Sequence, residues 1–101
     1  MVTIFCIHNL IIMIKAKIIV KGLVQGVGYR YYCYKKANEY DITGYAKNLP
    51  NGDVEVEVEG DQYLIMSFLK ELKIGPSKSS VTALDHVFMD YEDEFDEFRM
   101  Y

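Results

Sequence analysis

Residues 44–60 read GYAKNLPNGDVEVEVEG, and this stretch decides the fold class. At its centre, Pro50-Asn51-Gly52 favours the tight turn of a β-hairpin. Valine and glutamate then alternate strictly from Asp53 to Glu59, which places all the valines on one face of a strand and all the glutamates on the other. A strand with one buried face and one face toward water is typical of an antiparallel sheet. We therefore predict two paired strands, over residues 44–49 and 53–59.

The sequence before this hairpin predicts a strand followed by a helix. Residues 15–21, KAKIIVK, are rich in β-branched residues and end at Gly22. Residues 29–40 contain neither glycine nor proline, and apolar or aromatic side chains recur there at helical spacing. We assign the tyrosine-rich segment 29–34 to the core rather than to a stacking platform. The expected buried stripe of this helix consists of Tyr29, Cys33, Ala37 and Tyr40.

The sequence after the hairpin predicts a second helix and two more strands. Asp61 is a suitable N-cap for a helix that runs to about Lys73 and is stopped by Gly75-Pro76. Residues 81–91 predict a long strand, and residues 95–101 a short strand or a tail that pairs with the sheet. The expected buried stripe of the second helix consists of Leu64, Phe68, Leu69 and Leu72.

This order, β-α-β-β-α-β plus a tail, predicts an α+β fold of the ferredoxin-like type. In that βαββαβ sandwich an antiparallel sheet carries both helices on one face. We divide the chain into an N-terminal extension over residues 1–13 and one domain over residues 14–101. The extension is apolar but shorter than the ~20 residues that a membrane span needs, and it lacks the features of a secretory signal. Met13 directly precedes the first strand and is the expected natural start; the alternative is that residues 1–12 add a functional strand.

Composition excludes several classes of function. The 101 residues carry a net charge of -4, whereas a nucleic-acid-binding domain is usually basic. The two cysteines, Cys6 and Cys33, form no C-x-x-C motif, and His8 and His86 are not spaced as metal ligands. We therefore expect reduced cysteines, no metal and no other cofactor. We also expect a cytoplasmic monomer that binds neither nucleic acid nor membrane.

The loop between the first strand and the first helix is a candidate anion site. Residues 22–28, GLVQGVG, contain three glycines and lead into a helix, where free backbone N–H groups and the helix dipole favour an anion. Arg30 follows directly, and its planar fork can bind two phosphate oxygens together. The alternatives are a simple tight turn for the loop and, for Arg30, an ion pair with the acidic stretch 90–97. Taken together, the loop and Arg30 favour anion binding.

Known phosphate-binding motifs do not fit this loop. A Walker A loop needs Gly-Lys-Ser/Thr, and residue 27 is valine; the G-x-G-x-x-G fingerprint fails because Tyr31 stands at its last glycine. A cysteinyl-phosphate mechanism places its cysteine before the loop arginine, whereas Cys33 follows Arg30.

Two segments resemble the signatures of the acylphosphatase family. They are GLVQGVGYR, over residues 22–30, and GYAKNLPNGDVEVEVEG, over residues 44–60, and they are separated as in that family. The tail Phe98-Arg99-Met100-Tyr101 is also similar, although Met100 stands where the family often has arginine and Tyr29 where it more often has phenylalanine. The resemblance covers residues 14–101, all but the first dozen or so residues.

The resemblance implies hydrolysis of the mixed anhydride between a carboxylic acid and phosphate, without a metal. It assigns Arg30 to holding the phosphoryl group and Asn48 to positioning the attacking water. The backbone amides of Val24, Gln25, Gly26, Val27 and Gly28 would cradle the remaining phosphate oxygens. Asn48 could instead only shape the turn that follows it. The acidic stretch 90–97 is expected to be a solvated connection rather than a metal or partner site.

Three other functions stay open on sequence grounds. A non-catalytic module on the same fold could bind phosphate or a small metabolite. An RNA-recognition domain shares the βαββαβ order, but its central strand would carry aromatic and basic residues where this chain has glutamates. A carbamoyl-phosphate-handling domain of a larger maturation protein would be expected to continue after Tyr101 with zinc-binding cysteines.

Overall fold

The computed structural model describes residues 11–101. Most of the expected extension over residues 1–13, together with Cys6 and His8, lies outside the described residues. The elements in chain order are β1 (Met13–Leu23), α2 (Tyr29–Glu39), β2 (Thr43–Asn48), β3 (Val54–Asp61), α3 (Gln62–Ile74), β4 (Ser80–Asp90) and β5 (Phe98–Met100).

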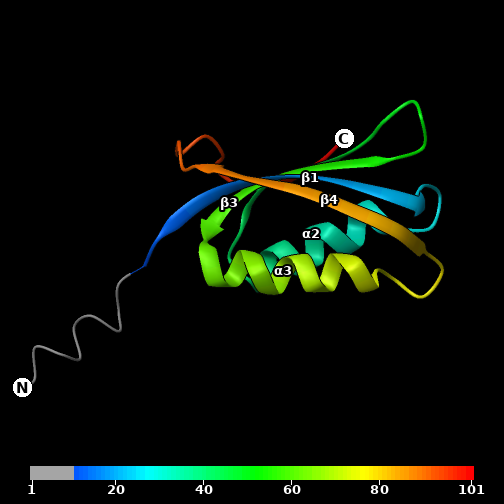
Figure 1. Ribbon diagram of the computed structural model, residues 1–101, viewed down its shortest axis with the longest axis horizontal. Coiled ribbons are helices and arrows are strands. Elements are labelled where there is room, and N and C mark those ends of the chain that lie inside the picture. Colours follow the sequence, from blue (N-terminus) through cyan, green and yellow to red (C-terminus); the bar gives the residue numbers. More distant parts are fainter. Residues whose placement is uncertain (1–10) are drawn as a thin grey trace, which may run out of the picture.

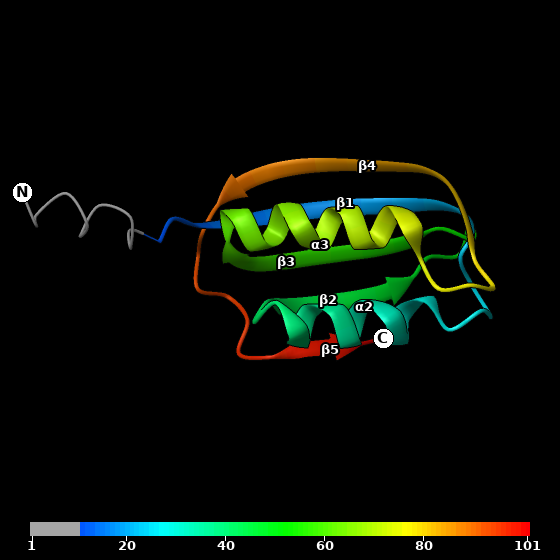
Figure 2. The same ribbon diagram turned by 90° about the horizontal axis from the view of Figure 1, so that it is seen from below.

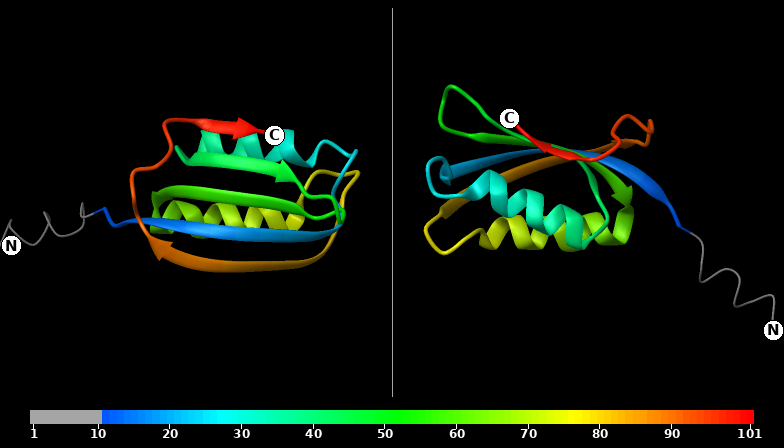
Figure 3. Two further views of the ribbon diagram at one scale, coloured as in Figure 1. Left: turned by 90° about the horizontal axis from the view of Figure 1, so that it is seen from above. Right: turned by 180° about the vertical axis from the view of Figure 1, so that it is seen from behind.

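The strands form one sheet in the order β4-β1-β3-β2-β5. The first four strands pair antiparallel, and β5 adds a parallel pair beside β2. Both helices lie on the same face of the sheet, as Figure 1 shows from the side and Figure 2 from below. The other face carries no helix in the described chain and is the one seen in the left panel of Figure 3. This arrangement is the predicted ferredoxin-like sandwich, with the expected tail present as the fifth strand.

The core lies between the sheet and the two helices. The valines of β3 are fully buried, so the predicted alternation is confirmed on this face. In α2 the buried residues are Tyr29, Cys33 and Ala37, as the spacing predicts, whereas Tyr40 is the C-cap after the last turn and is only partly buried. In α3 the prediction was wrong at one position: Ile65 is buried, and Leu64 is 36% exposed at the edge of the stripe. The stripe is centred between Ile65 and Phe68, so Leu64 only borders the core.

The helix boundaries follow from local hydrogen bonds. The Asp61 side chain accepts from Tyr63 N at 3.0 Å, which confirms the predicted N-cap of α3. Gly75 ends α3 with a positive φ of 69° and donates its N–H to Glu71 O. Within residues 11–101 the helices are too short or too polar to cross a membrane.

The first strand is longer than predicted and passes through Gly22. The register of β1 against β4 shifts between Lys21 and Gly22, which marks a bulge. Gly22 has a φ of 121°, and a side chain there would lie 2.1 Å from the Ser80 carbonyl oxygen. Only glycine fits this bulge, and the bulge turns the chain into the loop that precedes α2.

The face of β3 opposite the core is not fully open to water, which corrects the prediction for Glu59. This carboxylate is 1% exposed and accepts hydrogen bonds from the backbone of Glu92, Glu94 and Phe95. The acidic stretch 90–97 is therefore anchored to the sheet, although the side chains of Glu92 and Glu94 stay 66% and 50% exposed. This anchoring fixes the connection that leads into β5.

Lys15 neutralises part of the negative charge of the glutamates on this face of the sheet. Its side chain is 2% exposed, lies on the same face as Glu59 and forms ion pairs with Glu57, Glu92 and Glu94. The hydrogen bonds to Glu92 and Glu94 raise the pKa of the Lys15 ammonium, so the buried lysine stays charged.

Candidate active site

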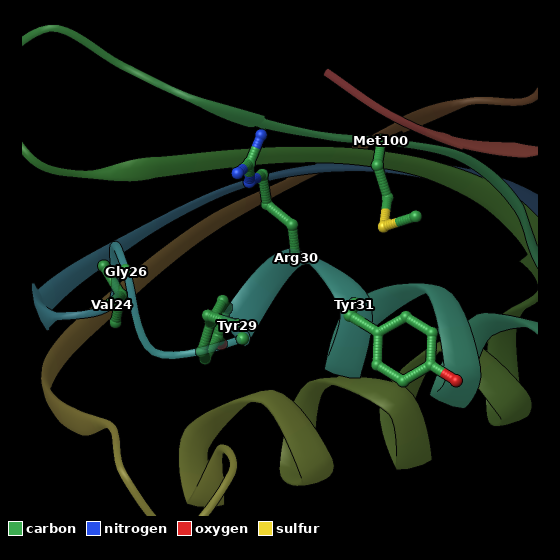
Figure 4. A pocket seen from close by; sticks show the side chains of 7 residues that line it. Val24, Gly26, Tyr29, Arg30, Tyr31 and Met100 are labelled. Atoms are coloured by element: carbon green, nitrogen blue, oxygen red, sulfur yellow. The ribbon is translucent and has the colours of Figure 1, made fainter.

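A pocket of about 290 Å³ opens where the loop before α2 meets the end of β5. Figure 4 shows Arg30 in the middle of it, with Val24 and Gly26 on one side and Tyr31 and Met100 on the other. The lining residues are Val24, Gly26, Gly28, Tyr29, Arg30, Tyr31 and Met100.

The glycines of the loop open the backbone toward this pocket. Gly26 and Gly28 have φ values of 73° and 80°, a conformation that side chains disfavour, and nothing lies within 4 Å of where a Cβ would be. Gly28 is the N-cap of α2 and provides no side-chain cap, and the first turn of the helix contains no acidic residue. The free N–H groups of this helix start are therefore available to an anion.

Two of the five predicted loop residues do not line the pocket. The Gln25 side chain turns away and donates from Nε2 to the carbonyl oxygens of Leu49 and Asp53, at 2.8 and 2.9 Å. Val27 is partly buried and packs against the core. Their side chains thus hold the loop in place, and any contribution to an anion would come from their backbone.

Arg30 stands in the first turn of α2 and reaches across to the end of the sheet. Its Nη1 donates to the main-chain oxygen of Tyr101 at 2.6 Å. The acceptor is thus a main-chain oxygen and not, as in the alternative interpretation, a carboxylate of the acidic stretch 90–97. The remaining N–H groups of the guanidinium are left to bind an anion.

Asn48 ends β2 on the face that carries the helices, because it alternates with the buried Gly44 and Ala46. It does not line the pocket itself. Its Oδ1 is buried and has no hydrogen-bond partner in the part of the chain that the structure describes. A buried acceptor without a partner is costly, so this oxygen is suited to bind a water or a ligand.

Hydrogen bonds tie both the loop and Arg30 to the neighbours of Asn48. On one side, Gln25 binds the carbonyl of Leu49, the next residue in the chain. On the other side, Tyr101 receives the Arg30 hydrogen bond and donates its own N–H to Ala46 O at 2.8 Å. The structure thus places Arg30, the loop and the end of β2 at one end of the sheet.

Cys33 is not a candidate nucleophile. It is fully buried in the core, and this burial raises the pKa of its thiol, which keeps it protonated. Among residues 11–101 there is also no group of three or more His, Cys, Asp or Glu side chains that could hold a metal ion.

Sequence reasoning missed three pocket residues, Tyr29, Tyr31 and Met100. Tyr29 is buried in the core as predicted, and it also lines the pocket. Tyr31 was assigned to the core but is 56% exposed, and Met100 was noted only as a departure from the usual tail and is 45% exposed. Helical spacing carried a signal for Tyr31, since it falls between the buried positions Tyr29 and Cys33. The position of Met100 depends on how β5 pairs with β2, which a three-residue strand does not reveal in sequence.

Comparisons with known proteins point to one family. The family model described as Acylphosphatase matches residues 16–100. The acylphosphatase of Chlorobaculum tepidum is 40% identical over 86 residues, which are 85% of this chain and 94% of that protein. The acylphosphatase of Thermus thermophilus is 51% identical over 67 residues, 66% of this chain and 76% of that protein. The crystal structure of acylphosphatase from Bacillus subtilis superimposes with a TM-score of 0.84 at 32% identity, covering 87% of this chain and 98% of that one.

Proposed function

The chain belongs to the acylphosphatase family and hydrolyses acyl phosphates, and we propose that Arg30, Asn48 and the loop over residues 24–28 carry out this reaction. The observation that carries the proposal is that the free N–H groups at the start of α2, Arg30 and the unpartnered Oδ1 of Asn48 lie at the same end of the sheet.

In this proposal the phosphoryl group lies between the loop and Arg30. The backbone N–H groups of the loop and of the first turn of α2 bind some of its oxygens, and the guanidinium binds the others. Charge spreads over the equatorial oxygens in the transition state of phosphoryl transfer, so donors fixed around those oxygens lower the barrier. The Tyr101 oxygen holds the guanidinium in position before the substrate arrives.

Asn48 orients the attacking water in the same proposal. Its Oδ1 accepts a hydrogen bond from the water, and the water oxygen attacks phosphorus as the bond from phosphorus to the acyl oxygen breaks. The carboxylate leaves with that electron pair, and the proton of the water passes to a phosphate oxygen or to the leaving carboxylate. A neutral amide suits this place, because a carboxylate would repel the phosphate.

We further infer that the reaction needs no metal ion and takes place in the cytoplasm in a monomeric enzyme that binds neither nucleic acid nor membrane. A carboxylate is a good leaving group, so a Lewis acid or strong base contributes less here than with a phosphate monoester. The buried, reduced thiol of Cys33 fits a reducing compartment. The alternative of a non-catalytic phosphate or metabolite-binding module has no support in the comparisons.

The test is a phosphate-release assay with acetyl phosphate, with p-nitrophenyl phosphate as the monoester control. We expect hydrolysis of acetyl phosphate alone, unchanged by a chelator and inhibited competitively by inorganic phosphate. Activity that a chelator abolishes and a divalent ion restores would contradict the metal-independent mechanism. Failure to hydrolyse any acyl phosphate would contradict the function itself.

A further inference from the structure

We propose that Met100 and Tyr31 form a subsite for the acyl group, and that the enzyme prefers acyl phosphates whose acyl group is apolar and uncharged, above all aromatic. This inference rests on the proposed function, because it assumes that the phosphoryl group lies between the loop and Arg30.

The two side chains lie where the acyl group of such a substrate would extend. Figure 4 shows Met100 and Tyr31 on the side of Arg30 opposite to Val24 and Gly26. They come from different elements, since Met100 ends β5 and Tyr31 is in the first turn of α2. A phosphoryl group held by the loop and Arg30 therefore leaves this side of the pocket to the rest of the molecule.

The pocket is larger than a phosphate needs. Its volume of about 290 Å³ corresponds to roughly ten water molecules at about 30 Å³ each, which exceeds the five heavy atoms of a phosphate. Met100 and Tyr31 remain 45% and 56% exposed in the free enzyme, so their apolar surface is open to a ligand. Covering this surface with an aromatic acyl group would remove apolar area from water.

Aromatic packing beside the pocket holds the Tyr31 ring in a defined orientation. The Tyr31 ring stacks on Tyr34, with centroids 6.1 Å apart and planes inclined by 24°. Tyr34 in turn packs against Phe98 at 6.5 Å, and Phe98 is buried on the same face of β5 as Met100. The ring of Tyr31 thus offers a fixed face, and little side-chain entropy is lost when a second ring stacks on it.

A second negative charge on the acyl group would find no partner here. Among the described residues that line the pocket, Arg30 is the only one with a charged side chain. The neighbouring arginine, Arg99, alternates to the opposite face of β5, and its Nη2 pairs with Glu97 at 2.7 Å. A carboxylate on the acyl group would lie against the methionine and the tyrosine, and it would lose hydration without gaining a salt bridge.

The first experiment compares three substrates on the unmodified enzyme. We expect kcat/KM to be highest for benzoyl phosphate, lower for acetyl phosphate and lowest for succinyl phosphate, with about a tenfold step between the first two. One extra apolar contact in a pocket typically gives a step of this size. Equal values for benzoyl and succinyl phosphate would overturn the proposal.

The second experiment uses variants of Met100 and Tyr31. Met100→Ala and Tyr31→Ala should each lower the ratio of benzoyl to acetyl phosphate several-fold, and Met100→Arg should raise the relative value for succinyl phosphate. Met66→Ala is the matched control, because Met66 is 48% exposed on α3 and does not line this pocket. Circular dichroism should show that every variant is folded. Ratios that stay unchanged in both alanine variants would overturn the proposal.

A binding measurement separates this inference from the proposed function. Phenylphosphonate should compete with the substrate, or bind in calorimetry, more tightly than methylphosphonate does, and Met100→Ala should reduce the difference. An enzyme that hydrolyses acyl phosphates but binds the two phosphonates equally would refute the subsite alone. A protein that hydrolyses none of the three substrates would refute the proposed function.

Discussion

The Nη1 atom of Arg30 lies 2.6 Å from the main-chain oxygen of Tyr101, 71 residues further along the chain. This hydrogen bond connects the first turn of α2 to the residue after β5. The sheet holds the acceptor in place, because Tyr101 N itself donates to Ala46 O on β2. The guanidinium is therefore oriented before a substrate binds, which reduces the entropy lost on binding.

Replacing Arg30 should impair both phosphate binding and turnover. Arg30→Ala should lower kcat/KM by about 10²–10³ and weaken competitive inhibition by phosphate, because in the proposed mechanism the guanidinium contacts the phosphoryl group in the ground state and the transition state. Arg30→Lys should not restore activity, since a compact ammonium lacks the planar fork with which a guanidinium binds two phosphate oxygens side by side. The control is Arg99→Ala, which removes an arginine that is 62% exposed and should keep most of the activity. A rescue by lysine would argue against two-point binding.

Replacing Asn48 should affect turnover more than binding. Asn48→Ala should lower kcat by about 10²–10³ while the inhibition constant of phosphate stays nearly unchanged, because in the proposed mechanism the amide orients water rather than phosphate. Asn51→Ala is the control, since the Asn51 Oδ1 accepts from Asp53 N within the same hairpin and has a purely structural role. If the two variants showed the same, near wild-type kcat, Asn48 would only shape the turn.

Replacing Gln25 should loosen the loop. Gln25→Ala removes two hydrogen bonds that join the loop to the β2–β3 hairpin, and should lower the free energy of unfolding by about 1–2 kcal/mol. KM for acetyl phosphate should rise as well, because the loop amides would no longer be held toward the phosphate. Urea unfolding and steady-state kinetics measure the two effects. Gln62→Ala, at the start of α3, is the matched control; a KM effect in both variants would mean that the loop is not specifically involved.

The stability of the protein should fall as the pH rises above about 8.5. Burial raises the pKa of the Cys33 thiol and of the Tyr29 hydroxyl, so the folded protein keeps protons that the unfolded chain loses near pH 8.5 and pH 10. The folded state then binds more protons, and the free energy of unfolding decreases with pH, approaching about 1.4 kcal/mol per pH unit for each proton.

The variant Cys33→Ala tests this assignment. It should be less stable than the wild type at pH 7, because Cys33 is fully buried, but its stability should stay level until about pH 10. Urea unfolding at pH 7, 8.5, 9.5 and 10.5 on both proteins would show the difference in slope. Parallel curves for the two proteins would assign the alkaline loss of stability to other groups.

A chain that begins at Met13 should fold and keep its activity. It lacks the carbonyl of Ile12, which accepts from Gln62 N at 2.9 Å, so we expect a loss of about 1 kcal/mol. A chain that begins at Lys17 is the control and should not fold, because it also lacks the buried Lys15 and Ala16. Loss of activity in the longer of the two chains would mean that residues 1–12 belong to the functional domain.

The sequence predicts those parts of the structure that depend on near neighbours. The turn at Pro50-Asn51-Gly52, the N-cap at Asp61 and the alternation in β3 each arise from contacts within a few residues, so the local pattern is sufficient. That the loop and Arg30 lie together could be predicted in the same way, because they follow one another in the chain.

Two errors, at Leu64 and Tyr31, concern which face of a helix a residue occupies, and the others concern contacts between distant segments. Glu59 fits the pattern of a residue facing water, yet the acidic stretch 90–97 folds over it and supplies backbone N–H donors. The pocket role of Met100 and the hydrogen bond from Arg30 to Tyr101 also require β5 to lie beside β2. No local pattern encodes which strand a distant segment will join, so these features appear only in the structure.

The strand order has a consequence for the speed of folding. Among the described strands, only β2 and β3 are joined by a tight hairpin. Strand β1 pairs with β4, which places Ile14 opposite Asp90. After β4, at one edge of the sheet, the chain crosses to the other edge, where β5 pairs with β2. Each of these distant pairings loses chain entropy before any contact energy is gained, which slows folding of such topologies to milliseconds or seconds. The hairpin can form early and independently of the rest. The proposed catalytic pocket, which is lined by both Arg30 and Met100, should be among the last features to form, so recovery of activity after dilution from denaturant should lag behind the recovery of hairpin structure.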